Sequence, residues 1–150
     1  MKNAVQKITN TECMSTKLVP YVNFQGNAEE AVNFYATALG GEVTMLSRYG
    51  EAPMPCDESE KQWIMHARVV FGENMIMISD TPKNRPFGIT GNIQLSISMD
   101  DAAEMETVFN NMAEGGNVIM PLADQFWGAK FGMLTDKFGV NWMFNCELKK

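Results

Sequence analysis

The sequence predicts an α+β fold built from two βαβββ modules, and the main reason is a weak internal duplication. Residues 26–43, GNAEEAVNFYATALGGEV, are echoed by residues 101–118, DAAEMETVFNNMAEGGNV. A second echo follows in the same order, between FGENMIMIS at 71–79 and FGVNWMFNC at 138–146. The length of 150 residues is enough for one domain, or for two small halves that share a core.

The first half is expected to contain one helix among four strands. Its helix has an apolar stripe at positions i, i+3, i+4 and i+7, formed by Ala31, Phe34, Tyr35 and Ala38. The paired glycines Gly40 and Gly41 then end the helix. The expected elements are a strand at 19–24, a helix at 28–39 and strands at 42–49, 63–71 and 74–80, with a polar loop at 50–62.

The second half is expected to repeat this order. Its first strand alternates Gln94, Ser96 and Ser98 with Leu95, Ile97 and Met99, so one face is buried and the other meets water or a cavity. In both halves an F-G-x-N segment precedes the last strand, where Asn after Gly suits a tight hairpin. The expected elements are a strand at 92–99, a helix at 101–114 and strands at 117–123, 128–135 and 140–147.

These elements predict one domain over residues 19–147, with modules at about 19–80 and 92–147 and a linker at 81–91. Residues 1–18 are expected to be a flexible tail without an apolar signal region. No uncharged apolar run approaches the ~20 residues of a membrane span. Three cysteines without a CxxC pair fit reduced thiols, so we expect a cytoplasmic protein, with Cys146 in the core.

Charge and composition exclude several classes of function. The net charge is −6, and the only cluster of cations is at the terminal Lys149 and Lys150, so we expect no nucleic-acid or membrane partner. The chain has one histidine, His66, so a site with two imidazoles cannot come from one copy. It also lacks a G-x-S-x-G nucleophile turn.

Four segments carry a resemblance to a known family. PYVNFQGNAEEAVNFY, RYGEAPMP, HARVVFGENMIMISD and FWGAKFGMLTDKFGVNWMFN resemble, in order, the motifs of the PhnB-like branch of the vicinal-oxygen-chelate superfamily. That superfamily includes glyoxalases, bleomycin-resistance proteins and dioxygenases. The resemblance covers about Pro20 to Asn145. It implies that the two modules form a curved sheet cup, and that a homodimer completes the edges and sites of such open cups.

In metalloenzymes of the superfamily, the first and last strands of each module each supply one metal ligand, usually His or Glu. Carried over through the repeat, these positions fall on Pro20, Ile76, Gln94 and Met143. Zinc, nickel, manganese and iron need several nitrogen, oxygen or thiolate donors. A prolyl ring and an isoleucine have no side-chain donor, and a thioether binds these ions weakly. We therefore expect no metal and no cofactor.

The residues left for a site line the cup or its mouth. By the repeat, Phe24 shares the face of Gln94, and Met143 rather than Trp142 looks into the cup. His66 begins a strand and Glu51 lies in a loop, where each is more often solvated or structural than functional. Asp136 is expected to cap a turn. The predicted ligand-binding residues are Phe24, Glu51, His66, Gln94, Trp127, Phe131 and Met143.

The leading hypothesis is a metal-free protein of the bleomycin-resistance type that binds a small molecule of unknown identity, driven by apolar burial and aromatic stacking. The main alternative is a glyoxalase-like lyase or isomerase with a relocated metal, or with cofactor-free acid–base catalysis by His66 and Glu51. A third possibility is a structural dimer without a ligand.

Overall fold

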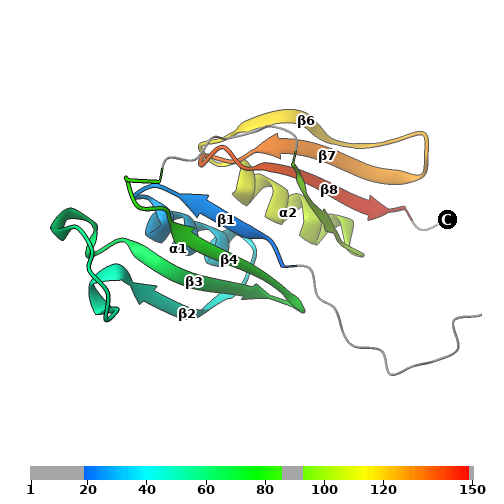
Figure 1. The fold of residues 1–150 in the computed structure, drawn as a ribbon. Coiled ribbons are helices and arrows are strands. Elements are labelled where there is room, and N and C mark those ends of the chain that lie inside the picture. Colours follow the sequence, from blue (N-terminus) through cyan, green and yellow to red (C-terminus); the bar gives the residue numbers. More distant parts are fainter. Residues whose placement is uncertain (1–18, 86–92, 149–150) are drawn as a thin grey trace, which may run out of the picture.

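The computed structural model describes residues 19–85 and 93–148 (Figure 1). The first half contains β1 (Tyr21–Phe24), α1 (Ala28–Ala38), β2 (Glu42–Arg48), β3 (Ile64–Phe71) and β4 (Asn74–Asp80). The second half contains β5 (Leu95–Ser98), α2 (Ala102–Ala113), β6 (Asn117–Asp124), β7 (Ala129–Thr135) and β8 (Asn141–Glu147). The predicted α+β fold of two βαβββ modules is confirmed. The predicted loop at 50–62 holds two short 3-10 helices, η1 (Tyr49–Glu51) and η2 (Glu58–Glu60).

Each half forms one four-stranded sheet, and the strand order is the same in both. The orders are β1-β4-β3-β2 and β5-β8-β7-β6. In each sheet the first strand runs parallel to the last strand, and the other two ladders are antiparallel. The two halves that resemble each other in sequence therefore also have the same strand order and strand directions.

Each helix packs on one face of its own sheet, and the two helices also contact each other (Figure 1). In the first half, Val32 of α1 lies in a fully buried cluster with Val69 and Ile78. In the second half, the ring of Phe109 meets that of Phe144 edge-on, with the centroids 5.2 Å apart. The buried cluster runs through both halves, so they share a core.

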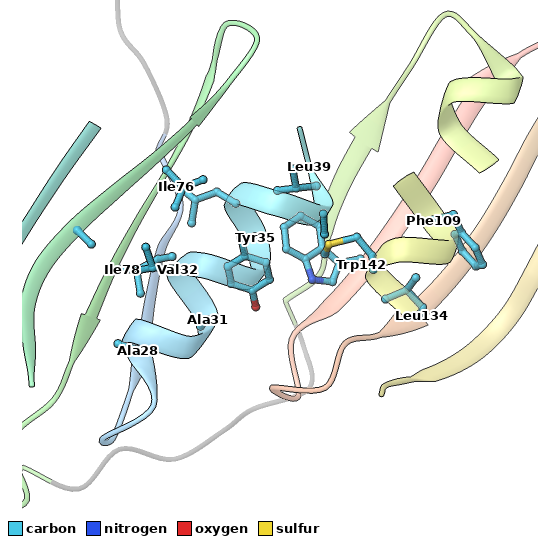
Figure 2. Packing of buried hydrophobic residues seen from close by; sticks show 14 of the residues in the cluster. Ala28, Ala31, Val32, Tyr35, Leu39, Ile76, Ile78, Phe109, Leu134 and Trp142 are labelled. Atoms are coloured by element: carbon cyan, nitrogen blue, oxygen red, sulfur yellow. The ribbon is translucent and has the colours of Figure 1, made fainter. Parts of the chain in front are cut away.

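The contact between the halves is made by α1 and the end of the second sheet. Tyr35 of α1 and Trp142 of β8 point toward each other in Figure 2, with ring centroids 5.7 Å apart. Tyr35 is fully buried and Trp142 is 2% exposed. Asp136, in the β7–β8 turn, accepts the N–H groups of Phe138 and Val140 at 2.9 and 3.0 Å, so its predicted capping role is confirmed.

The paired glycines after each helix have separate roles. Gly40 and Gly115 have φ of +64° and +71°, a left-handed conformation that ends a helix and that side chains disfavour. The second glycine of each pair lies against the neighbouring strand. A Cβ on Gly41 would collide with the carbonyl oxygen of Val70, and one on Gly116 with that of Thr135. The glycine pairs therefore let each helix end tightly against its own sheet.

The F-G-x-N echo does not keep the same strand register. In the first half Phe71 pairs with Asn74 across a two-residue turn. In the second half the turn is longer, because Thr135 pairs with Asn141. As a result Ile76 is buried in the core whereas Met143 is half-exposed on the opposite face. The structural counterpart of Met143 is Met77, one residue later than the echo predicted.

A correction of one residue also applies to the first strands, and it changes the prediction for Phe24. Tyr21 pairs with Met77 and Ser96 with Met143, so Tyr21 is the counterpart of Ser96. Phe24 then lies on the core face, where it is 4% exposed and meets the ring of Phe138 edge-on at 5.7 Å. Phe24 is a core residue and not part of a cup.

The predicted N-terminal tail and the predicted linker between the modules fall largely outside the described residues. The predicted tail at 1–18 lies outside the described residues, and so does most of the predicted linker, at 86–92. Among the helices that are described, none is long and apolar enough to span a membrane.

Candidate ligand-binding site

One face of each sheet points away from the helices, and no other part of residues 19–85 and 93–148 packs over it. We call the uncovered face of the first sheet open face A; its residues are Tyr21, Asn23, Met45, Ser47, His66, Arg68, Met75 and Met77. The uncovered face of the second sheet is open face B; its residues are Gln94, Ser96, Ser98, Met120, Phe131, Met133, Met143 and Asn145. Both faces combine methionine and aromatic side chains with uncharged polar groups, apart from His66 and Arg68.

Open face B holds three of the predicted site residues. Gln94 is exposed at the start of β5, and Met143 pairs with Ser96 on one side and Met133 on the other. Phe131 lies one row further along, opposite Asn145. The face is therefore apolar at its centre with amides and hydroxyls around it. Trp142 is on the covered face, as predicted.

The β6–β7 connection adds an aromatic corner to this face. Trp127 is 51% exposed and meets the ring of Phe131 at 5.8 Å. Phe126, before it, is 97% exposed. Such exposed rings at a loop tip are typical of surfaces that contact a ligand or another chain.

A cleft of about 550 Å³ opens between β5 of the second half and the β3–β4 hairpin of the first half, beside the residues that precede β1. Gln94, Ser96 and Met75 reach it from the two open faces. Pro20 and Ile76 line its inner side. The volume lies within the range of small-molecule pockets. Three of the four positions that were carried over from metal ligands thus meet in one cleft, although Met143 does not line it.

His66 lies on open face A and is held by two neighbours. The Tyr21 hydroxyl is 3.0 Å from Nδ1, and Nε of Arg68 donates to Nε2 at 3.3 Å. The Tyr21 and His66 rings also contact each other, with centroids 5.6 Å apart. Burial, and then the charge of Arg68, lower the pKa of His66. The imidazole is therefore neutral at pH 7.

Glu51 has a local structural role. It lies in η1, and its carboxylate accepts the backbone N–H of Arg48 at 3.0 Å. Within the described residues His66 and Glu51 make no hydrogen bond with each other. The structure does not bring these two candidates together as an acid–base pair.

Sequence reasoning missed Tyr21 and Arg68. Both occupy open face A, and Met77 pairs with each of them, so the three lie in one row across the sheet. The signal for Arg68 was the alternation in HARVV, which puts it two residues after His66 and on the same face. Tyr21 was hidden by the error of one residue in the repeat.

The residues present do not fit the metal of the superfamily's enzymes. With the corrected register, the adjacent positions on the first and last strands are Tyr21 beside Met77 and Ser96 beside Met143. Divalent zinc, nickel or iron is not held by a phenol, a hydroxyl and two thioethers. In residues 19–85 and 93–148, no group of three or more His, Cys, Asp or Glu could hold an ion.

The chain is similar to known sequences over most of its length. Residues 16–144 match the family described as 3-demethylubiquinone-9 3-methyltransferase. Protein YjdN of Escherichia coli (strain K12) is 32% identical over 138 residues, which cover 85% of this chain and 93% of that protein.

Solved structures have the same fold. Protein PA1353 from Pseudomonas aeruginosa is 44% identical, with a TM-score of 0.82 over 90% of this chain and 100% of that one. The PhnB protein from Bacillus cereus is 31% identical, with a TM-score of 0.73 over 87% of this chain and 99% of that one. A glyoxylase/bleomycin resistance protein/dioxygenase domain from Frankia is similar in fold alone, with a TM-score of 0.66, 10% identity and coverage of 91% and 94%.

Proposed function

Because the chain belongs to the 3-demethylubiquinone-9 3-methyltransferase family, in the PhnB-like branch of the vicinal-oxygen-chelate superfamily, we propose that it is a metal-free protein that binds a small, largely apolar molecule. The observation that carries the proposal is the composition of the two open faces. Half of the residues named on each face are methionine, tyrosine or phenylalanine, and the polar side chains among them supply hydrogen bonds. This is the usual lining of a small-molecule site. Methionine adapts to irregular ligands, which suits such a lining.

We also propose that the protein is a homodimer. Each open face exposes large apolar side chains to solvent in the single chain, with Tyr21 at 45%, Met45 at 40% and Trp127 at 51% exposure. A second copy is the natural cover, because a twofold axis pairs open face A of each chain with open face B of the other. Each such pairing would enclose one cup between two sheets, with Phe131 and Met143 on one wall and His66 on the other.

The donor set supports binding without a metal. Tyr21 and Ser96 offer only a phenol and an alcohol oxygen, and the two methionines beside them are soft, neutral donors. Apolar burial then supplies the affinity, at roughly 25 cal/mol per Å² before the costs of ordering.

The enzyme alternative has less support from these residues. His66 contacts the Tyr21 hydroxyl through Nδ1 and accepts from Arg68 at Nε2, whereas the Glu51 carboxylate caps a turn. A general base needs its partner within hydrogen-bond reach. The methyl transfer in the family's description would need a site for a methyl donor such as S-adenosylmethionine, so that compound belongs among the ligands to be tested.

The test is native mass spectrometry of the purified protein, followed by thermal-shift screening. The screen covers aromatic metabolites, glycopeptide drugs and S-adenosylmethionine. We expect a dimer that carries or accepts a small organic molecule, with a stabilisation of about 2.7 kcal/mol at a hundredfold excess over Kd. Phe131→Ala should weaken that binding, while Asn110→Ala, on the exposed side of α2, should not. If S-adenosylmethionine is the one compound that binds, and methyl transfer is detected, the binding-protein proposal is rejected and the protein is a methyltransferase.

A further inference from the structure

Three side chains of open face A form a chain of contacts in which each donor can be assigned. Arg68 can only donate, because a guanidinium has no acceptor, so Nε2 of His66 must be the acceptor of the 3.3 Å contact. A neutral imidazole with an acceptor at Nε2 carries its proton at Nδ1. Nδ1–H therefore donates to the Tyr21 oxygen, which lies 3.0 Å away.

This assignment leaves only donors for a ligand. The Tyr21 oxygen accepts from His66, so its own O–H remains free to donate. Arg68 uses Nε for His66, and no hydrogen bond of its two terminal NH₂ groups occurs within the described residues. Arg68 and Tyr21 are both exposed on the face, so these groups are accessible. The free donors of Arg68 and Tyr21 favour a ligand group that accepts hydrogen bonds and does not donate them. An anionic oxygen, as in a carboxylate or phosphate, is such a group.

The charge of Arg68 is also unmatched. The chain has a net charge of −6, yet in the described residues no carboxylate lies within ion-pair distance of Arg68. By contrast, Arg48 pairs with Glu29 at 2.6 Å and Lys130 with Asp124 at 3.6 Å. The second copy would not supply the missing charge from the centre of open face B. The segments 94–98, 131–135 and 141–145, all within the described part of the chain, contain no Asp or Glu.

We propose that Tyr21, His66 and Arg68 form a binding site for an organic anion, with a carboxylate or phosphate group on an apolar body. The anionic oxygens accept from the Arg68 guanidinium and from the Tyr21 hydroxyl. His66 is a positioning residue that holds both donors. Met77 pairs with Tyr21 and Arg68, and Met45 pairs with Arg68 on its other side, so the apolar body has methionines beside the anion site. This proposal rests on the proposed function, because it names the class of ligand for that cup.

His66 offers a direct readout, because it is the only histidine of the chain and gives one Hε1 signal in the untagged dimer. The probes are phenylacetate, phenyl phosphate and the neutral phenylacetamide, which share one ring. We expect saturable shifts of the His66 signal with at least one anion, at an affinity about tenfold or more above that for phenylacetamide. The two anions separate carboxylate from phosphate as the preferred group.

Two variants test the role of Arg68. Arg68→Gln should abolish the preference for the anion and leave phenylacetamide binding unchanged, and Arg68→Lys should restore part of it. Lys130→Gln is the matched control, since that cation already has a carboxylate partner. The proposal is overturned if anion and amide bind equally, if Arg68→Gln keeps the preference, or if that variant instead weakens the dimer without an effect on anions. Equal binding leaves the proposed function intact, whereas an absence of binding by every probe and in the wider screen rejects both.

Discussion

The Tyr35 hydroxyl donates to Oδ2 of Asp136 at 2.6 Å, and this bond joins the helix of the first half to the last turn of the second. Nε1 of Trp142 donates to the same oxygen at 2.9 Å. Asp136 is 3% exposed, and its four bonds include two from backbone N–H groups of its own turn. A carboxylate with this many donors holds the two halves in a fixed orientation, and residues of both halves line the cleft.

Tyr35→Phe should destabilise the protein by about 1.5–3 kcal/mol, because it leaves a buried carboxylate oxygen with one donor fewer. Urea unfolding measures the loss, and Tyr21→Phe is the control, since its exposed hydroxyl should contribute under about 0.5 kcal/mol. Equal stability of the two variants would show that the bond between Tyr35 and Asp136 is not a link between the halves.

Alkaline pH should weaken the fold through the same residue. Burial first, and then the charge of Asp136, raise the pKa of Tyr35 far above its ordinary range. Near pH ~10 the Tyr35 phenol therefore ionises only in the unfolded chain. The contribution of this phenol to the free energy of unfolding is complete below pH ~10 and is lost progressively above it, by up to ~1.4 kcal/mol per pH unit. Urea midpoints from pH 8 to 11 should fall more steeply for the wild type than for Tyr35→Phe. Parallel curves would contradict the assignment.

A charge on open face B should separate the dimer without unfolding the chain. Met133 lies at the centre of that face and outside the buried core, so Met133→Lys places an unpaired ammonium in the proposed interface, opposite the face that carries the like charge of Arg68. Sedimentation should show monomers for this variant and dimers for Asn110→Lys, whose side chain is exposed on α2. A Met133→Lys protein that remains a dimer would place the interface elsewhere.

His66 should titrate below its ordinary value, and with a defined tautomer. Its pKa is lowered by burial and by Arg68, so the ring takes up its proton at a lower pH than an ordinary histidine. The Hε1 signal should give the lower pKa, and Arg68→Gln should raise it toward the ordinary value. Nitrogen-15 shifts should show the proton on Nδ1. A proton on Nε2 would contradict the donor order from Arg68 to Tyr21.

The sequence was sufficient to predict the architecture because the repeat and the periodicity are both local signals. The stripe of Tyr35 and its neighbours marked α1, and the alternation at Gln94, Ser96 and Ser98 marked the uncovered face of β5. The motifs were long enough to identify the branch, which the family match and the relatives confirm.

The site was harder to predict because it depends on register across strands. The F-G-x-N echo is real in sequence, but the β7–β8 turn is longer than the β3–β4 turn, which moves the counterparts on the last strands by one residue and exchanges their faces. A separate error of one residue, in matching the first strands, placed Phe24 in the cup and hid Tyr21. The spacing of His66 and Arg68 could have shown that they share a face, although it was not used, whereas the contact with Tyr21 required the parallel pairing of β1 with β4.

Elemental analysis of the native protein, purified without chelator and dialysed against metal-free buffer, tests the central claim of metal-free binding most directly. We predict only trace divalent metal, and a melting temperature that a chelator does not change. About one tightly bound divalent ion per subunit, whose removal lowers the melting temperature, would contradict the account.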